Sequence, residues 1–311
     1  MRIAVIDLGT NTFNILIVEV AEDKNYVTLF QTKIAVKLGE GGINNNIIQP
    51  VPFQRGIDAL KEYKKIIREH KVDKVHAMAT SAIRDAANGQ DFVAEVKAQT
   101  GFEVKVISGD EEAELIYHGV RQAVTMTDER SLIIDIGGGS IEFIIANKDE
   151  IFWKKSFPVG AARLIERFKP SDPITDLQMI AIRDFLKIEF TPLFNAVKEM
   201  HVRELIGSSG SFDSLAEMIA HRFYTPEILD NVTEYSFNFK DFGIIFDTVI
   251  DSTREERLKM KGLIEMRVDM IVVSMIIIQY VVWAFDIQRV RLSTYALKEG
   301  VLYDLLREVK Q

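Results

Sequence analysis

Two short segments of the chain carry an aspartate directly before a glycine-rich turn. They read Asp7-Leu8-Gly9-Thr10-Asn11 and Asp135-Ile136-Gly137-Gly138-Gly139-Ser140. Turns of small residues present consecutive backbone N–H groups to an anion, and glycine allows a positive φ and a close approach to a ligand. An aspartate beside such a turn can hold a divalent cation against phosphate oxygens. The pattern therefore indicates a polyphosphorylated ligand.

The two segments fall into register when Asp7 is aligned with Asp135. In each, one apolar strand leads into the aspartate and a second apolar strand follows the turn. A single turn of this kind is also typical of an ordinary β-hairpin, so the repetition carries the inference. The second strand has Asn14 in the first copy and the ionisable Glu142 in the second. We therefore expect a duplicated domain with one turn suited to binding and the other to metal or water chemistry.

Two further segments could contribute to such a site. Residues 108–117 begin an acidic helix that Ser108 or Asp110 can cap, and carboxylates are favoured at a helix start. This segment is either only a well-capped helix or a helix that points one carboxylate into a cleft. Residues 207–211 form a third small-residue loop that opens a helix and offers N–H groups to an anion. A plain turn is the alternative, and spacing alone leaves both questions open.

The elements that would position these residues follow from periodicity and turn signals. In the first half we expect a hairpin at 1–20 and a third strand at 27–37. Helices are expected at 51–70 and 90–100, and short strands at 74–80 and 103–107. In the second half we expect a hairpin at 131–155 and strands at 204–206 and 289–292. Helices are expected near 173–200, at 212–221, over the apolar region 254–285 and at 298–308. We place one α/β domain at 1–124 and the other at 125–297, with a hinge near 122–130. Helix 298–311 would pack back on the first domain.

Length and composition bound the function. The 311 residues exceed the usual size of one core, and a net charge of −8 argues against DNA binding. The chain has no cysteine, so disulfides and thiolate metal sites are excluded, and its five histidines show no ligand spacing. The longest apolar stretch, 270–285, is shorter than the roughly 20 residues that a membrane span needs. With no signal peptide recognised, we expect a cytoplasmic protein with no membrane partner.

Taken together, the chain resembles the exopolyphosphatase/guanosine pentaphosphate phosphatase (Ppx/GppA) family of the actin, sugar-kinase and Hsp70 superfamily. Six motifs in the family's order carry the resemblance: Asp7-Leu8-Gly9-Thr10-Asn11-Thr12-Phe13, Thr80-Ser81-Ala82-Ile83-Arg84, Ile107-Ser108-Gly109-Asp110-Glu111-Glu112-Ala113, Asp135-Ile136-Gly137-Gly138-Gly139-Ser140-Ile141-Glu142, Gly207-Ser208-Ser209-Gly210-Ser211 and Leu292-Ser293-Thr294-Tyr295-Ala296-Leu297-Lys298-Glu299-Gly300. The resemblance implies two actin-like (ribonuclease H-like) domains around a central cleft, in the family's short form.

The resemblance also implies an activity. It is the release of a terminal phosphate from inorganic polyphosphate or from guanosine pentaphosphate by attack of water, with Mg²⁺ or, in its place, Mn²⁺. By motif match, Glu112 is the catalytic base and Glu142 the second catalytic glutamate, while Asp7, Asp135 and Glu142 are the metal candidates. The phosphate-binding candidates are Gly9, Thr10, Asn11, Arg84, Gly137, Gly138, Gly139, Ser140, Ser208 and Gly210.

Two departures from the family pattern bear on substrate choice. Glu114 stands where many members have arginine, and Ile141 stands where threonine is usual. Losing an arginine removes a bidentate phosphate partner. On a helix Glu114 points roughly 200° away from Glu112, so we expect it at the cleft edge. A kinase that uses ATP on a small acceptor and a non-catalytic sensor of polyphosphate or (p)ppGpp are the alternatives, and a homodimer is plausible.

Overall fold

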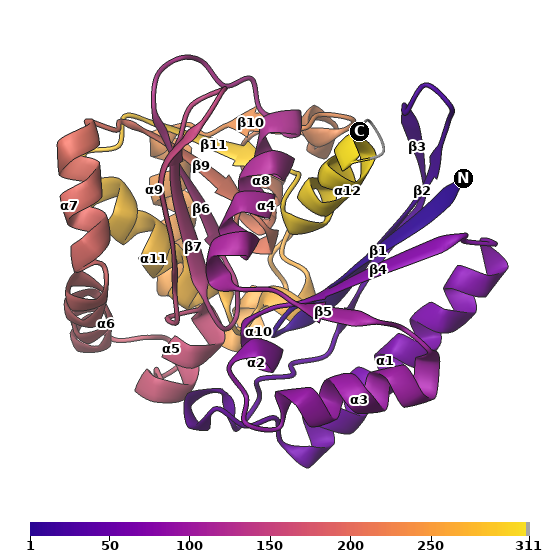
Figure 1. Ribbon diagram of the computed structural model, residues 1–311. Helices are drawn as coiled ribbons and strands as arrows, with labels where there is room; N and C mark the ends of the chain where they lie inside the picture. Colours follow the sequence, from indigo (N-terminus) through magenta and orange to yellow (C-terminus); the bar gives the residue numbers. More distant parts are fainter. Residues whose placement is uncertain (309–311) are drawn as a thin grey trace.

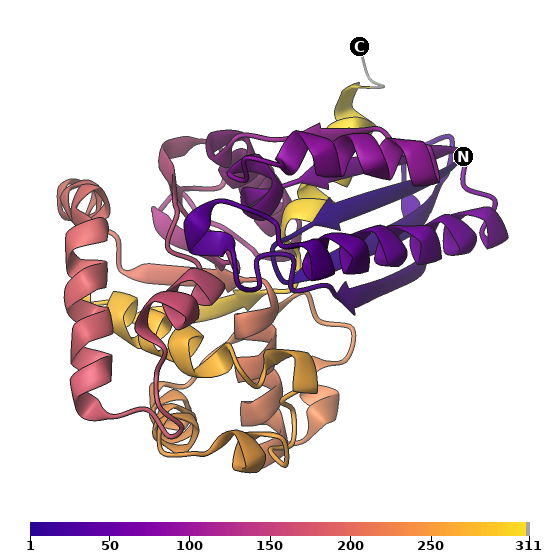
Figure 2. The same ribbon diagram turned by 90° about the horizontal axis from the view of Figure 1, so that it is seen from below.

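The computed structural model describes residues 1–308, and residues 309–311 of the expected last helix lie outside this range. Figure 1 shows two α/β halves, with the N-terminus in the first half. Figure 2, viewed from below, separates the halves into two bodies of sheet and helix.

The first half is built on a five-stranded sheet in the order β3-β2-β1-β4-β5. Its strands are β1 (Arg2–Leu8), β2 (Thr12–Val20), β3 (Tyr26–Ala35), β4 (Lys74–Ala79) and β5 (Val104–Val106). β1, β2 and β3 form antiparallel pairs, whereas β4 and β5 extend the sheet in parallel. The associated helices are η1 (Ile43–Asn45), α1 (Pro50–Glu69), α2 (Ser81–Arg84) and α3 (Gly89–Thr100).

The second half repeats this plan in a six-stranded sheet with the order β10-β11-β9-β6-β7-β8. The strands are β6 (Ser131–Ile136), β7 (Ile141–Ala146), β8 (Ile151–Phe157), β9 (Glu204–Ser208), β10 (Glu234–Ser236) and β11 (Arg289–Ser293). Five of these strands, taken in the order β8-β7-β6-β9-β11, pair in the same antiparallel and parallel pattern as β3-β2-β1-β4-β5 of the first sheet. Strand β10 is added at the edge and pairs antiparallel with β11. The prediction of a duplicated actin-like α/β fold is therefore confirmed.

Helices cover both faces of each sheet, which explains why the central strands are apolar at successive positions. On β1, Ala4 and Ile6 face a core shared with α1 and α3, whereas Ile3 and Val5 face the opposite core. The outer face of the second sheet is covered by α5 (Ala161–Phe168), α6 (Asp176–Glu189), α7 (Thr191–Met200), α8 (Gly210–Phe223), α9 (Phe239–Ile250) and α11 (Ile271–Ala284). The short α10 (Arg254–Arg257), η2 (Pro226–Leu229) and η3 (Glu265–Arg267) lie in the connections.

Two helices form the layer between the sheets, namely α4 (Gly109–Ala123) and α12 (Leu297–Glu308). They pack on each other as Figure 1 shows, and their core includes Ile133 of the second sheet. Their crossing needs glycine, because a Cβ at Gly119 would overlap the carbonyl of Ala296, directly before α12, and a Cβ at Gly300 would overlap the carbonyl of Leu115 in α4. The described part of the last helix therefore packs on α4. The domain boundary at 124/125 stays a prediction.

The expectation of one helical region over 254–285 was wrong. The structure breaks it into α10, η3 and α11, with turns between them. Gly262 has a φ of 83°, which a right-handed helix does not allow, and a Cβ there would overlap the backbone of Glu217. Helices α5 and α9 and strand β10 were not predicted. Among the residues that the structure describes, no helix combines the length and apolar character needed to cross a membrane.

Candidate active site

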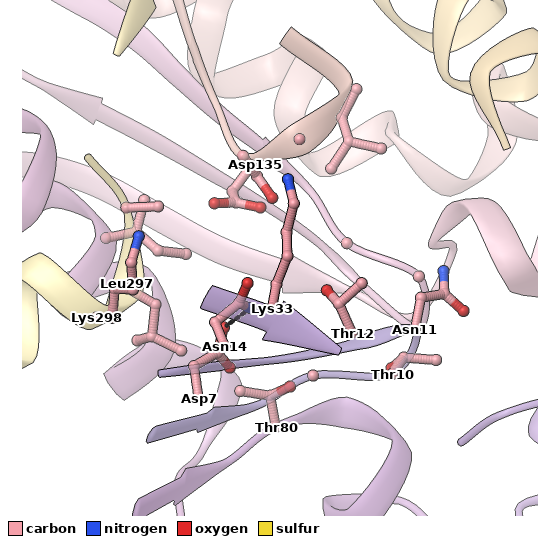
Figure 3. Close-up of a pocket in the computed structure, with 18 of the residues that line it drawn as sticks. Asp7, Thr10, Asn11, Thr12, Asn14, Lys33, Thr80, Asp135, Leu297 and Lys298 are labelled. Atoms are coloured by element: carbon pink, nitrogen blue, oxygen red, sulfur yellow. Dashed lines mark hydrogen bonds between the residues drawn. The ribbon is translucent and has the colours of Figure 1, made fainter. Parts of the chain in front are cut away.

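A cavity of about 500 Å³ lies where the ends of the two hairpins meet. Figure 3 shows Asp7, Asn14 and Thr80 on one side and Asp135 on the other, with Lys33 extending between them. The predicted residues that line the cavity are Asp7, Gly9, Thr10, Asn11, Glu112, Asp135, Gly137, Gly138, Gly139, Ser140, Glu142 and Gly210. The folded chain therefore brings most of the predicted site together.

Both glycine-rich turns close in the same way. The amide of Gly9 donates to the Thr12 carbonyl (3.2 Å), and the amide of Gly137 donates to the Ser140 carbonyl (3.0 Å). A Cβ at Gly9 or Gly137 would lie 2.8 or 2.9 Å from the same carbonyl oxygen, which is too close. Neither glycine is among the described residues with positive φ. These turns therefore need glycine for space, not for a left-handed backbone.

The carbonyl groups of the second turn are held from behind by α5. The amides of Ala161 and Ala162 each donate at 2.9 Å, to the carbonyls of Gly137 and Gly138 respectively. The Nε of Arg163 donates to the Gly139 carbonyl at 2.8 Å. Because a trans peptide points its N–H opposite its C=O, this anchoring directs the amide side of the turn toward the cavity. The turn is therefore arranged to bind an anion.

The two hairpins place different pairs of side chains at the cavity. Asp7 is paired across the strands with Asn14, whose Nδ2 donates to Asp7 Oδ2 at 2.9 Å. Asp135 is paired in the same register with Glu142. Burial raises the pKa of Asp7 to about 7 against the lowering effect of Asn14. Burial and repulsion from Asp135 raise the pKa of Glu142 to about 7.

Glu112 enters the cavity from the start of α4. The Ser108 hydroxyl caps this helix by accepting from the Glu111 amide (3.1 Å), which settles the choice between the two predicted caps. Glu112 is 7% exposed, and its Oε2 accepts from Nη1 of Arg84 at 2.7 Å. Burial and, next, repulsion from Glu142 raise the pKa of Glu112 well above its usual value, although Arg84 acts in the opposite direction. Arg84 thus contacts Glu112 without lining the cavity.

The loop after β9 corrects the prediction for Ser208. This side chain is fully buried and donates to Asp135 Oδ2 at 2.8 Å, so it supports the carboxylate and does not line the cavity. The neighbouring Ser209 lines the cavity beside Gly210. Ser209 has a φ of 71°, a conformation that side chains other than glycine rarely adopt.

Three cations of the cavity were not predicted, namely Lys33, Arg267 and Lys298. The Nε of Arg267 is buried and has no hydrogen-bond partner among the described residues. A phosphate oxygen in the cavity is a suitable acceptor for such a group. Lys298 lies within the last of the six family motifs, and Arg267 lies just before the apolar stretch at 270–285, so the sequence around each of them gave a local signal. Lys33 lies in an ordinary strand pattern, and nothing in the sequence around it indicated a place in the site.

Glu114 does not line the cavity, and its expected position at the edge of the cleft stays a prediction. Its Oε2 is 2.5 Å from Nζ of Lys154 on β8. The pairing lowers the pKa of Glu114, so this carboxylate is charged and already neutralised by a neighbour.

The donor set around the cavity suits a hard cation in one specific way. Asp135 and Glu142 are buried oxygen donors whose charges repel each other, so a bound cation would offset that repulsion. Across residues 1–308, however, no three acidic or histidine side chains form a ready-made metal group. Mg²⁺ typically uses one or two carboxylates and completes its shell with phosphate oxygens and water. The roles of Asp7, Asp135 and Glu142 as ligands stay a prediction.

Known proteins resemble this chain over most of its length. The model of the Ppx/GppA phosphatase family matches residues 16–309. A crystal structure of an exopolyphosphatase from Cytophaga hutchinsonii superposes with a TM-score of 0.95 at 42% identity, covering 99% of this chain and 98% of that one. Exopolyphosphatase 1 of Mycobacterium tuberculosis is 27% identical over 97% of this chain and 87% of its own length. The guanosine-5'-triphosphate,3'-diphosphate pyrophosphatase of Photobacterium profundum is 28% identical over 99% of this chain and 60% of its own.

Proposed function

The chain belongs to the Ppx/GppA phosphatase family, and from this premise we propose that it releases the terminal phosphate of inorganic polyphosphate, of guanosine pentaphosphate or of both. The names of its relatives, exopolyphosphatase and guanosine-5'-triphosphate,3'-diphosphate pyrophosphatase, support these two substrates. The observation that carries the proposal is the buried Glu112, held by Arg84 and facing a cavity walled by two phosphate-type turns.

In the proposed reaction, Glu112 orients a water molecule and accepts its proton as the water oxygen attacks the terminal phosphorus. A carboxylate with a raised pKa suits this task, because a general base works best near the pH at which the enzyme operates. The amides of the two turns and the cations Lys33, Arg267 and Lys298 stabilise the charge that develops on the phosphoryl oxygens. The phosphorus–oxygen bond between the terminal phosphate and the rest of the substrate breaks, and the shortened polyphosphate or nucleotide leaves.

Phosphatases of this family generally depend on a divalent metal. We propose Mg²⁺, with Mn²⁺ as a substitute, held by Asp135 and Glu142 and, from the opposite hairpin, Asp7. When bound, the cation would neutralise charge on the leaving phosphate. Since the chain has no cysteine and its proposed substrates are intracellular phosphates, we place the reaction in the cytoplasm. We also propose that the protein forms a homodimer.

One assay tests the proposal against its rivals. Purified protein is incubated with polyphosphate, guanosine pentaphosphate or ATP, with and without Mg²⁺, and free phosphate is measured. We expect release from polyphosphate or pentaphosphate without any acceptor. ADP formation that requires an acceptor would identify a kinase, and tight binding without turnover would identify a sensor.

A further inference from the structure

Arg163 joins the two halves of the molecule through all three of its guanidinium nitrogens. It lies in the first turn of α5 and is 8% exposed. Its Nε donates to the carbonyl of Gly139 (2.8 Å), its Nη1 to that of Ile43 (2.6 Å) and its Nη2 to Oδ2 of Asp85 (2.8 Å). Gly139 belongs to the second phosphate turn, whereas Ile43 and Asp85 belong to the first half. A rigid planar group with three such acceptors fixes their relative positions.

The contact with Asp85 continues to the candidate base. Asp85 Oδ2 also accepts from the hydroxyl of Ser81 (2.9 Å), and its Oδ1 lies 3.4 Å from Nε of Arg84. The other side of Arg84 donates to Glu112 at 2.7 Å. Four side chains of alternating charge, Arg163, Asp85, Arg84 and Glu112, therefore connect α5 of the second half with the start of α4.

This connection is largely shielded from water, which makes its geometry consequential. The side chains of Arg163 and Glu112 are each 9% exposed, that of Arg84 is 19% and that of Asp85 is 30%. Removing one partner from a shielded charge network leaves its neighbour without compensation, and the neighbour then moves. Arg163 does not line the cavity, so it acts on the site through other groups.

We propose that Arg163 is a positioning residue for the hydrolytic reaction. Through Asp85 and Arg84 it holds Glu112 in place, and through the Gly139 carbonyl it holds the second phosphate turn. Base and turn are then aligned only when the two halves are closed on each other. The catalytic part of this role rests on the proposed function, whereas the link between the halves does not.

Kinetics provide the first test. Arg163→Met removes all three contacts, Arg163→Lys keeps a charge but not the fork, and Asp85→Asn breaks the path to Glu112. We expect kcat for polyphosphate to fall about 10- to 100-fold in Arg163→Met, since small misplacements of catalytic groups cost that much. KM should change by a smaller factor, and Arg163→Lys should be intermediate. Arg167→Met is the matched control, because Arg167 lies one turn later on α5 and is exposed.

The double variant Arg163→Met/Asp85→Asn separates a shared path from general damage. If both residues act through Glu112, the double variant should be no slower than the slower single variant. Losses that multiply would overturn the proposed path. A wild-type kcat in Arg163→Met would overturn the positioning role altogether.

Distance measurement provides a second test that needs no turnover. Because the chain has no cysteine, Lys65→Cys on α1 and Lys187→Cys on α6 give one spin label in each half. We expect a narrow distance distribution in the labelled parent and in Arg167→Met, and a broader, longer one in Arg163→Met. An unchanged distribution would overturn the link between the halves. Absence of phosphate release from any substrate would defeat the proposed function, while this measurement would still decide whether Arg163 holds the halves together.

Discussion

The two hairpins share a backbone but differ in charge. Each closes a turn from Gly to the residue three positions later, and each pairs its aspartate with the same position on the following strand. In the first hairpin the partner is Asn14, which donates to Asp7, whereas in the second it is Glu142, which repels Asp135. The first pair is thus joined by a hydrogen bond, whereas the two carboxylates of the second pair repel each other and accept from Ser208 and Ser156 instead.

The turns are also anchored differently. The carbonyls of Thr10 and Asn11 accept from the amides of a loop, at Gly39, Val36 and Lys37. The corresponding carbonyls of the second turn accept from the start of α5 and from Arg163. The backbone that closes the turns is therefore alike in the two hairpins, whereas their side chains and anchoring segments differ, and the second hairpin pairs two carboxylates.

The largest expected effect concerns Glu112, which faces the second hairpin. Glu112→Gln should lower kcat on the order of 10²-fold or more, because it removes the proposed general base, while substrate binding stays nearly intact. Steady-state phosphate release measures kcat, and a binding titration measures the affinity for substrate. Glu111→Gln is the matched control, since Glu111 is paired with Lys105 outside the cavity. A crippled Glu111→Gln with a normal Glu112→Gln would assign the base to the other glutamate.

Metal dependence should distinguish the hairpins next. Asp135→Asn and Glu142→Gln should each raise the Mg²⁺ concentration for half-maximal activity by about 10-fold or more. Asn14→Ala, at the matching position of the first hairpin, should leave that concentration near the wild-type value. Titration of activity with Mg²⁺ from an EDTA-treated stock measures this. Full turnover in excess EDTA would remove the metal from the mechanism, and equal shifts in all three variants would erase the contrast between the hairpins.

The contact between the two turns gives a stability test. A Cβ at Gly139 would lie 2.5 Å from Ser81 Oγ and 2.6 Å from Thr10 Oγ1, both in the first half. Gly139→Ala should lower the free energy of unfolding by about 1–3 kcal/mol and raise KM by pushing the turns apart. Gly243→Ala, in the open interior of α9, should instead stabilise by about 0.5–1 kcal/mol. Denaturant melts compare them, and a neutral Gly139→Ala would mean that the turns separate freely.

The smallest expected effect concerns Glu114. Because Lys154 already pairs with it, Glu114→Arg should change KM for long polyphosphate by a factor that corresponds to about 1 kcal/mol or less. Any gain should shrink as salt is raised, since exposed charges are screened. KM measured at low and high ionic strength decides this, and an equal gain at both would indicate direct contact with the substrate.

Interactions between residues close in the sequence determined the turns, their flanking strands and the helix cap of this protein. The aspartate–glycine turns and their flanking strands depend on neighbours in the chain, so Asp7, Asp135 and the turn glycines could be assigned from the pattern. Glu112, which lines the cavity, could be named as a candidate from the sequence because its acidic helix start matches a motif of the family. Ser108 as its cap follows from residues three positions apart.

Only the tertiary structure decided which charges meet at the cavity. Lys33, Arg267 and Lys298 come from segments far apart in sequence, and no local signal tells that they converge. Ser208 and Ser209 are adjacent in the loop, yet one is buried against Asp135 and the other lines the cavity. Arg163 looks like any arginine on an amphipathic helix until Ile43 and Asp85 are placed beside it. Turn and cap geometry is set by interactions between near neighbours, whereas the composition of the site is set by how two sheets and the helices between them pack.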